Sequence, residues 1–505
     1  MLARVTTFAI DGVRSRPITV EVDLHAGLPA FTIVGLGDQA VRESRERVRT
    51  AIQNSGFAFP QNRVTVNLAP ADLRKRGPGF DMAIAVGILA ASGQVPIDLL
   101  DRIAVYGELA LGGELRGVRG ALAVAEGTRE SGLDALIVPN ECAREAMLIG
   151  GIAVHGASDM REMASVLAGE PTSSSLPPLA AARAKAREVP DLGDVRGQVQ
   201  AVYALTTAAA GGHSLLLSGP PGTGKTMLAR RLPAILPPLT TNEAIEVTRI
   251  HSIAGLHSGG QLMAVRPFRA PHHTISASGL VGGGSTPAPG EATLAHLGVL
   301  FLDELAEFAR PALEALRQPL EDGRVAIVRG QRSALYPTLT MLVASTNPCP
   351  CGYAGQPRCR CGEADIARYQ RRLSGPLLDR IDLQVPVERP TAAELVEPSP
   401  HDTDAIRAQV LQARERQCAR LGDGACNGRM STAELRRHVR LDSASDAVLH
   451  KSYAEGRLSP RGHARVLRVA RTIADLRGDD RVAKSDVFAA IRFRQEIGET
   501  AEVAA

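Results

Sequence analysis

The sequence is poor in aromatic residues and in lysine. Only 3% of its 505 residues are aromatic, and tryptophan is absent. Its cores must therefore be built from Leu, Val, Ile and Ala, and no aromatic platform for stacking bases is evident. No apolar run reaches the roughly 20 residues that a membrane-spanning helix needs. The first residues alternate like a strand and lack the apolar core of a secretory signal, so we expect a cytoplasmic protein.

The remaining composition is that of a soluble globular protein, with 44% hydrophobic and 22% charged residues. The chain is too long for one hydrophobic core, and roughly two to four domains are expected. A formal net charge of +4 is small for this length. Any basic surface that binds nucleic acid must therefore be local.

The most informative stretch is a glycine-rich turn that matches the phosphate-binding loop G-x-x-x-x-G-K-[ST]. Apolar residues 213–218 before it predict a buried strand, and residues 227–232 after it predict a helix whose N-terminus faces an anion. Backbone amides of such a turn converge on phosphate oxygens, while the lysine reaches the β- and γ-phosphates and the threonine holds Mg²⁺. We therefore expect ATP and Mg²⁺ to bind at Gly219, Pro220, Pro221, Gly222, Thr223, Gly224, Lys225 and Thr226.

Two acidic residues follow a second apolar strand, predicted at residues 299–302. Ligands of open α/β sheets bind at the carboxyl ends of the strands. We expect Asp303 to hold Mg²⁺ and Glu304 to orient and deprotonate the attacking water. A third strand is predicted at residues 340–346 and ends at Asn347.

Four of the seven cysteines lie close together directly after Asn347, in the pattern C-x-C-x₇-C-x-C. Four thiolates on a short loop suit a structural tetrahedral Zn²⁺ site. The spacing is tighter than the usual C-x₂-C pairs, and free thiols in a reducing compartment are the alternative. The candidate ligands are Cys349, Cys351, Cys359 and Cys361.

Composition and periodicity divide the chain into four parts. Residues 1–170 form a first domain with alternating strands and helices, and residues 171–190 are a linker rich in Pro, Ser and Ala. Residues 191–395 are the α/β nucleotide domain. Residues 396–505 are helical, with helices expected at 432–440, 443–455, 460–476 and 484–494.

The first domain resembles the protease domain of the Lon family, an α+β fold like domain 2 of ribosomal protein S5. The resemblance rests on Arg76-Gly-Pro-Gly-Phe-Asp81 before an apolar helix and on the glycine-rich segment 107–119. Gly79 stands where that family has its serine, and no lysine lies between Lys75 and Lys185. A Ser–Lys dyad cannot be assembled, so we expect the fold without the protease chemistry. An assembly or DNA-contacting role is the expectation for this domain.

The nucleotide domain resembles the AAA+ ATPases. Its opening segment, residues 191–198, is similar to the segment that packs near adenine, which implies contacts from Val195 and Gln198. Asn347 corresponds to the first sensor of the γ-phosphate. The segment 373–382 resembles the one that presents an arginine finger to the neighbouring subunit, with Arg380 as the candidate. Arg371 and Arg372 are the alternatives for that role.

The helical part resembles a AAA+ lid of the Mg-chelatase C-terminal type. Ser459 and Pro460 predict the start of a helix. This places Arg461 at the position of the second sensor, with Arg465 as the alternative. Whether Arg461 acts on its own nucleotide or on a neighbour's is open at this point.

Two further segments are similar to elements of the Mg-chelatase and MCM-helicase clade. Residues 266–290, rich in glycine, resemble the helix-2 insert, and residues 323–337 resemble the hairpin that precedes the first sensor. In helicases of the clade both elements point into the pore of the ring. Arg329 and Arg332 beside the hairpin turn are the candidate DNA-binding residues, about a dozen positive charges in a hexamer. His272 and His273 could belong to the pore, to the nucleotide site or to the core.

Taken together, the Lon-like front domain, Arg269-Ala-Pro-His-His-Thr274 and Asn347-Pro-Cys-Pro-Cys-Gly352 resemble the YifB/ComM family of Mg-chelatase-like ATPases. The resemblance implies a hexameric ATP-driven helicase that promotes branch migration of DNA in recombination or natural transformation. The alternative is a chelatase-type ATPase that remodels a partner protein. Chelatase motor subunits lack a Lon-like domain by this resemblance, which favours the DNA motor. An ATP-dependent protease is disfavoured by the missing dyad.

Overall fold

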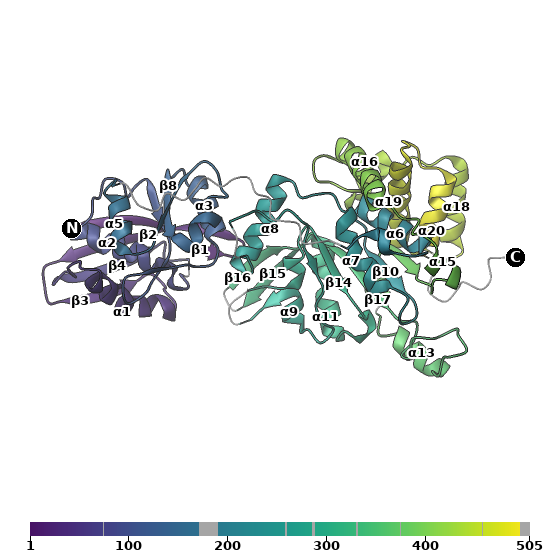
Figure 1. Ribbon diagram of the computed structural model, residues 1–505, viewed down its shortest axis with the longest axis horizontal. Helices are drawn as coiled ribbons and strands as arrows, with labels where there is room; N and C mark the ends of the chain where they lie inside the picture. The colour runs from purple at the N-terminus through teal and green to yellow at the C-terminus, as the bar shows by residue number, and fades with distance from the viewer. Residues whose placement is uncertain are drawn as a thin grey trace. The chain divides into compact units, whose positions relative to one another are not determined.

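The computed structural model describes residues 1–73, 75–170, 190–257, 260–284, 288–329, 332–373, 375–456 and 458–494. The expected linker lies almost wholly outside these residues. The chain separates into two units (Figure 1). Unit 1 comprises residues 1–185 and 241–264, and unit 2 comprises residues 186–240 and 265–505.

Unit 1 is built on a seven-stranded sheet with the order β3-β4-β2-β1-β5-β8-β9. Strand β2 pairs antiparallel with both β1 and β4, and the other neighbouring strands of the sheet pair in parallel. A short hairpin, β6 (Glu108–Leu109) with β7 (Leu115–Arg116), lies beside the sheet's helices. The strands are β1 (Leu2–Asp11), β2 (Arg14–His25), β3 (Ala30–Val34), β4 (Arg63–Ala69), β5 (Ile103–Val105), β8 (Ala135–Pro139) and β9 (Ala153–Ala157).

Helices cover the sheet of unit 1 and form two buried clusters. Helices α1 (Gln39–Asn54), α2 (Asp81–Ala91) and α5 (Met160–Leu167) pack in one cluster. Helices α3 (Ala121–Glu130) and α4 (Asn140–Ala146) pack in the other. Helix α1 begins after Asp38, whose carboxylate accepts a hydrogen bond from Val41 N at 3.0 Å. Every residue of α2 is buried, as its apolar sequence predicts.

Helix α8 (Thr241–Ile253) does not lie in the unit that its position in the sequence suggests. It follows the phosphate-loop helix in sequence, yet it belongs to unit 1. Arg249 pairs with Glu126 of α3, and Ser252 Oγ donates to the carboxylate of Glu145. Ile245 packs against the same apolar cluster as α3 and α4. The ATPase sequence thus contributes a helix to the preceding unit.

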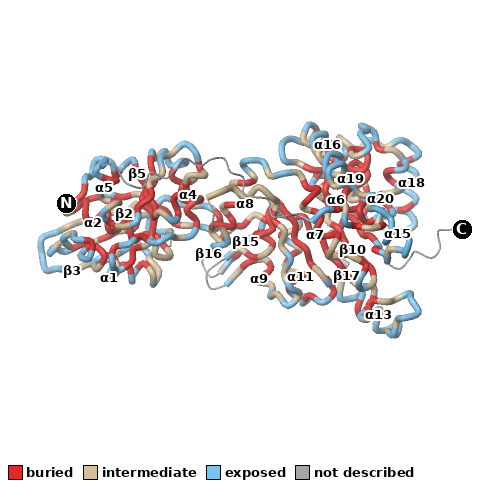
Figure 2. Tube along the Cα trace, viewed as in Figure 1, coloured by how far each residue is buried: buried red, intermediate tan, exposed pale blue. Residues whose placement is uncertain are grey.

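Unit 2 contains a five-stranded parallel sheet with the order β11-β14-β17-β10-β18. Its strands are β11 (Phe268–Arg269), β14 (Val299–Leu302), β17 (Met341–Thr346), β10 (Leu215–Ser218) and β18 (Leu383–Pro386). The four longer strands lie in the buried interior of this unit, drawn in red in Figure 2, with helices α6 (Val199–Gly211) and α7 (Lys225–Ile235) packed beside them. Because the strands are parallel, the residues that follow β10, β14 and β17 meet at one edge.

Smaller elements surround this sheet. Strands β15 (Arg324–Arg329) and β16 (Arg332–Pro337) confirm the predicted hairpin. The glycine-rich segment before β14 forms α9 (Ala277–Val281) and the short pair β12 (Gly282–Gly283) with β13 (Ala288–Pro289). The remaining elements are the helices η2 (Leu192–Asp194), α10 (Glu291–Leu294), η3 (Leu305–Glu307), α11 (Arg310–Ala315), α12 (Arg317–Asp322), α13 (Glu363–Gln370), α14 (Gly375–Leu378) and α15 (Ala392–Val396).

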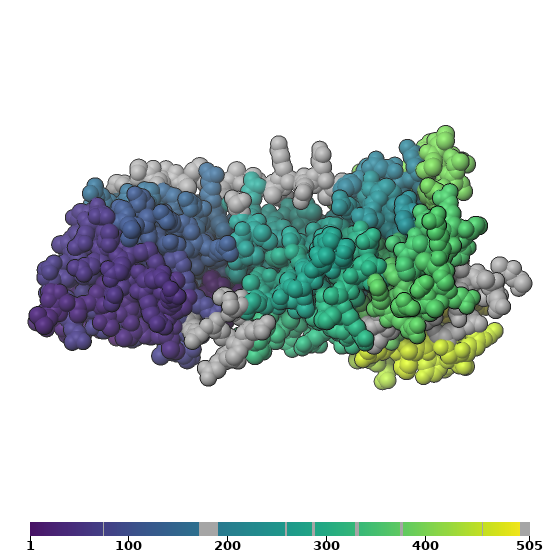
Figure 3. Space-filling model, turned by 90° about the horizontal axis from the view of Figure 1, so that it is seen from below, coloured from purple at the N-terminus to yellow at the C-terminus, as the bar shows by residue number. Residues whose placement is uncertain are grey.

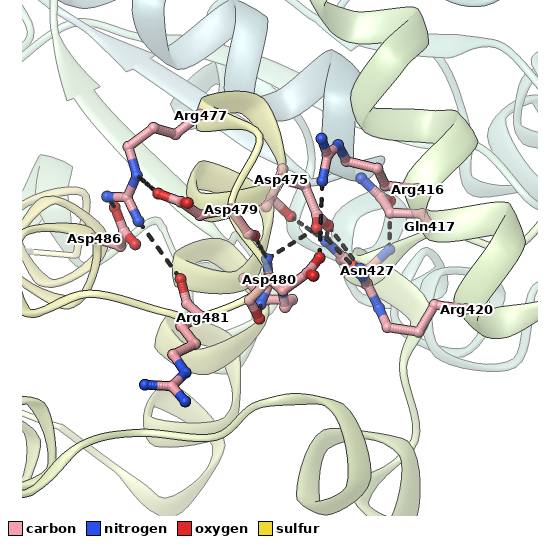
Figure 4. A network of polar contacts seen from close by, with 12 residues as sticks. Arg416, Gln417, Arg420, Asn427, Asp475, Arg477, Asp479, Asp480, Arg481 and Asp486 are labelled. Atoms are coloured by element: carbon pink, nitrogen blue, oxygen red, sulfur yellow. Dashed lines mark hydrogen bonds and ion pairs between the residues drawn. The ribbon is translucent and has the colours of Figure 1, made fainter.

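The C-terminal part of unit 2 is helical, as predicted. Its helices are α16 (Thr403–Leu421), α17 (Thr432–His438), α18 (Ser443–Ala454), α19 (Pro460–Arg477) and α20 (Lys484–Arg492). Figure 4 shows Arg420 and Asn427 directed at the buried carboxylate of Asp475. Arg420 Nη2 and Asn427 Nδ2 each donate to Asp475 Oδ2 at 2.7 Å. These bonds tie the end of α16 and the loop after it to α19.

Polar contacts join the helical part to the strands. The buried His213, just before β10, contacts Thr472 Oγ1 of α19 at 2.8 Å and Asp382 Oδ2 at 3.2 Å. Gln384 N donates to the Phe493 carbonyl at 2.7 Å. On the outside of unit 2, the yellow surface of the last helices lies next to the green surface of residues earlier in the chain (Figure 3).

Candidate active site

The phosphate-binding loop connects β10 to α7. Gly222 and Gly224 have φ of 77° and 90°, in the left-handed region that favours glycine. Lys225 Nζ donates to the carbonyls of Gly219 and Pro220 at 2.6 and 2.9 Å. It also donates to Asn347 Oδ1 at 3.1 Å. The structure therefore brings the loop lysine and the predicted sensor side chain together.

The predicted Mg²⁺ ligands also meet. Thr226 Oγ1 donates to Asp303 Oδ2 at 2.8 Å, across from the carboxyl end of β14. Oxygen ligands from a hydroxyl and a carboxylate are those that Mg²⁺ uses beside substrate phosphates. A residue that sequence reasoning missed, Ser345 of β17, donates to Asp303 Oδ1. This second bond orients the carboxylate.

Glu304 occupies an unusual backbone conformation, with φ of 54° and ψ of 53°. Its amide donates to Ser345 Oγ at 3.2 Å, so the same serine positions both acidic residues. Its carboxylate is about half exposed and lies 3.9 Å from His273 Nδ1. This contact places His273, whose role the sequence left open, beside the predicted general base.

Burial changes the ionisation of the loop lysine. Desolvation lowers the pKa of Lys225, and the nearby charges of Asp303 and Glu304 partly oppose that shift. A buried ammonium whose donors are met only by carbonyls and one amide oxygen is ready to exchange these partners for phosphate oxygens. The residues present thus fit a nucleoside triphosphate with Mg²⁺.

The segment expected near adenine contacts the loop from the side. Gln198 Nε2 donates to the Thr223 carbonyl at 3.2 Å and to the Glu388 carbonyl at 2.6 Å. Val195 is fully buried, and its carbonyl accepts a hydrogen bond from Ser399 Oγ at 2.7 Å. Their contact with a base stays a prediction.

The candidate arginine finger is paired within its own chain. Arg380 Nη2 lies 2.5 Å from Glu321 Oε1, and the side chain is only 11% exposed. Arg461, in the first turn of α19, is 64% exposed and lies 3.9 Å from the same carboxylate oxygen. The two predicted γ-phosphate arginines therefore converge on one acidic residue that the sequence did not single out. Their roles stay predictions.

The alternative arginines have other partners. Arg372 pairs with Glu307 at 3.2 Å, and Arg371 Nε donates to the Ala367 carbonyl at 3.1 Å. Arg465 Nη1 donates to Asp382 Oδ1 and to the Arg380 carbonyl, both at 2.6 Å. Arg465 thus fixes the backbone that carries Arg380.

The four clustered cysteines converge as a metal site requires. Their sulfur atoms all lie within 4.8 Å of one another. Cys349 Sγ is 3.4 Å from Cys351 Sγ and 3.9 Å from Cys359 Sγ, and the Cys351–Cys359 separation is 3.7 Å. A tetrahedral site with Zn–S bonds of about 2.3 Å places its sulfurs about 3.8 Å apart. Hydrogen bonds from the Arg360 and Tyr353 amides lower the pKa of Cys351 to about 6, which favours its thiolate.

The hairpin and the glycine-rich segment lie against each other. A Cβ added at Gly282 would approach Ile327 Cδ1 of β15 to 2.4 Å. The candidate DNA-binding side chains, those of Arg329 and Arg332, lie outside the described residues, although their backbones pair at the end of the hairpin. Their contact with DNA stays a prediction.

In unit 1 the position of the missing serine is blocked. A Cβ added at Gly79 would lie 2.6 Å from Cε2 of Tyr106. The Tyr106 hydroxyl donates to the Arg119 carbonyl at 3.1 Å, which holds the ring in place. A nucleophilic side chain at residue 79 would therefore require Tyr106 to move.

Comparison with known proteins identifies the family. A family model described as magnesium chelatase, subunit ChlI, matches residues 191–395, and its C-terminal counterpart matches residues 400–494. YifB of Escherichia coli is 42% identical over 495 residues, which cover 98% of this chain and 97% of the relative. Competence protein ComM of Haemophilus influenzae is 41% identical over 498 residues, with coverage of 98% and 97%. The chain belongs to the YifB/ComM family of Mg-chelatase-like ATPases.

Two further matches cover shorter parts of the chain. Lon protease 2 of Bacillus subtilis is 26% identical over 136 residues, about a quarter of each chain. A family model described as subunit ChlI of Mg-chelatase matches residues 20–142. The family model that matches this front domain is thus named after a chelatase subunit. The presence of the front domain therefore does not distinguish a DNA motor from a chelatase-type ATPase, although the sequence resemblance suggested that it would. Among the described residues of this YifB/ComM family member, no helix is long and apolar enough to span a bilayer.

Proposed function

We propose that this protein is an ATP-driven DNA translocase that works as a hexameric ring and promotes branch migration in homologous recombination or natural transformation. The observation that carries the ATPase part is the convergence of Lys225, Thr226, Asp303 and Asn347 at one edge of the parallel sheet. Glu304 lies at the same edge. The family membership supports this part as well.

Each of these residues has a distinct role in hydrolysis. Lys225 and the loop amides bind the β- and γ-phosphates. Thr226 and Asp303 hold Mg²⁺, which neutralises charge on the phosphate oxygens. Glu304 accepts a proton from the attacking water, and Asn347 orients that water and senses the γ-phosphate. His273 Nδ1 lies 3.9 Å from the Glu304 carboxylate, which is close enough for an electrostatic interaction with the base.

Assembly completes the site in this proposal. Arg380 and Arg461, the candidates for contact with the transition state, share Glu321 within one chain. In the ring Arg380 is directed at the nucleotide of a neighbouring subunit, and Arg461 acts on its own nucleotide or on a neighbour's. An arginine delivered in this way stabilises the charge that develops on the γ-phosphate.

The DNA part rests on the hairpin β15–β16, on its packing against the glycine-rich segment, and on the relative named competence protein ComM. Arg329 and Arg332 from six chains would contact the phosphate backbone, giving salt-dependent binding with little sequence preference.

A chelatase-type remodelling ATPase is the second candidate, because the family models that match residues 20–142, 191–395 and 400–494 all carry the ChlI name. Such a protein would act on a partner protein and not on DNA.

The deciding experiment measures ATP hydrolysis with and without single-stranded, duplex and branched DNA. Stimulation by DNA, together with ATP-dependent movement of a synthetic four-way junction, supports the motor. Hydrolysis that responds to none of these DNAs, and a junction that does not move, would leave the chelatase-type function as the better account.

We further propose that the cysteine cluster holds structural Zn²⁺. Three of the sulfur separations, at 3.4 to 3.9 Å, match the edges of a tetrahedral zinc–sulfur site. They are too long for a disulfide bond, whose S–S length is about 2.05 Å.

A further inference from the structure

The cysteine loop touches the phosphate-binding loop. Gly352, between the two pairs of cysteines, has φ of 85°, and a Cβ added there would lie 2.5 Å from Cδ and 2.6 Å from Cγ of Pro221. Pro221 is a residue of the phosphate-binding loop itself. The two loops therefore approach so closely that only glycine fits at residue 352.

A second contact lies on the other side of the first cysteine pair. Asn347, two residues before Cys349, accepts a hydrogen bond from Lys225 at 3.1 Å. Gly352 N donates to the Cys349 carbonyl at 2.9 Å, which closes a tight turn around the pair. Cys349 and Cys351 thus lie in the sequence between Asn347, which contacts the loop lysine, and Gly352, which contacts the loop proline.

Apart from backbone hydrogen bonds of its turns, such as Gln356 N to the Tyr353 carbonyl at 2.9 Å, the cysteine loop has little packing to hold its shape. Cys349 is fully buried, but residues 353–361 are all intermediate or exposed, and the four cysteines form no disulfide. Thiol groups are weak hydrogen-bond donors and acceptors, so four protonated cysteines give little stability to a turn. A metal ion bonded to all four sulfurs would hold the loop together in place of a hydrophobic core.

We propose that metal bound at the cysteine cluster controls nucleotide binding in this protein. The filled cluster keeps Gly352 against Pro221 and Asn347 at the edge where Lys225 meets phosphate, and so holds the phosphate-binding loop in the shape that binds nucleotide. Loss of the metal frees both residues. This inference rests on the nucleotide and zinc sites proposed above. It adds that metal occupancy of the cysteine cluster sets the affinity of the nucleotide site.

The test compares zinc content with nucleotide affinity in the full chain. Zinc is measured by elemental analysis, nucleotide affinity with a fluorescent non-hydrolysable ATP analogue, and folding by circular dichroism. The zinc-loaded protein, the protein stripped by a chelator, and Cys359→Ser are compared. Cys418→Ser, outside the cluster, is the matched control.

We expect one zinc per chain in the native protein and in Cys418→Ser. In the stripped protein and in Cys359→Ser, we expect nucleotide affinity about tenfold weaker, equivalent to about 1.4 kcal/mol, with helical content retained. Restored affinity on adding zinc back to the stripped protein supports the inference. Equal affinity with and without zinc, or absence of zinc from the native protein, overturns it.

A second comparison does not depend on removing the metal. Gly352→Ala should keep its zinc and lose nucleotide affinity, because the new methyl group displaces Pro221. Adding Pro221→Ala should recover part of that loss. Unchanged affinity in Gly352→Ala would show that the contact does not carry the coupling. If the zinc-loaded wild-type protein binds no ATP at all, the proposed function itself fails, which is a different result from equal affinity in the two metal states.

Discussion

Replacing Glu321 by glutamine tests how the arginine finger is held before assembly. Arg380 is 2.5 Å from this carboxylate and Arg461 is 3.9 Å from it. An arginine that stabilises a neighbour's γ-phosphate must first leave Glu321. Glu321 therefore competes with the nucleotide for both positive charges.

The size of this competition follows from exposure. Two charges 4 Å apart near a protein surface attract by about 4 kcal/mol before the costs of desolvation, side-chain ordering and salt are subtracted. The Arg380 side chain is only 11% exposed, but Glu321 is 46% exposed, so screening reduces the net value to about 1 kcal/mol. That energy corresponds to a change of about fivefold. An arginine finger contributes about 10³- to 10⁵-fold to hydrolysis, so the finger outweighs its restraint.

We therefore expect Glu321→Gln to raise steady-state ATP hydrolysis up to about fivefold, while Arg380→Ala lowers it at least about a thousandfold. Both are measured at several protein concentrations. The control is Glu314→Gln, which removes a partner of Arg317 at 2.5 Å on the adjacent helix. The reasoning is refuted if Glu321→Gln loses activity as completely as Arg380→Ala does, because Glu321 would then be needed for catalysis.

Three further predictions concern other parts of the site. Glu304→Gln should still bind ATP and assemble but hydrolyse about 10² to 10⁴ times more slowly, and wild-type turnover in a single-turnover assay would exclude Glu304 as the base. Replacing Arg329 and Arg332 by alanine should weaken DNA binding and flatten its salt dependence without changing basal ATP hydrolysis; an unaltered DNA titration would count against the hairpin as the contact. Because burial lowers the pKa of Lys225, its positive charge is lost at a lower pH than that of an ordinary lysine. ATP affinity should therefore fall at a lower alkaline pH than an ordinary lysine would give, and Lys225→Arg should remove this fall; an affinity that is flat from pH 7 to 10 in the wild type contradicts it.

The sequence predicted which residues meet at this edge of the sheet, because Asp303 and Asn347 directly follow apolar strands and Lys225 ends the loop motif after a third. Lys225, Asp303 and Asn347 needed no knowledge of tertiary structure beyond the rule that parallel strands end together. The helices α17 to α20 were also predicted, because their caps and periodicity are local signals. Helix α16 was not, since it is rich in charged residues and its few buried positions include the polar Gln417.

Contacts between distant segments could not be predicted in this way. Nothing in the sequence of α8 indicates that Arg249 pairs with Glu126 of unit 1. Glu321 ends an ordinary helix, and its contact with two arginines depends on how α12 and α19 pack. The approach of Gly352 to Pro221 likewise depends on two loops that meet only in the folded chain.

The central claim is that each nucleotide is shared between two subunits, and the most direct measurement is ATP hydrolysis per subunit as a function of protein concentration, with molecular mass recorded on the same samples. We predict that specific activity rises steeply with concentration and follows the appearance of a ring. Full specific activity in samples that contain only the monomer would contradict the account.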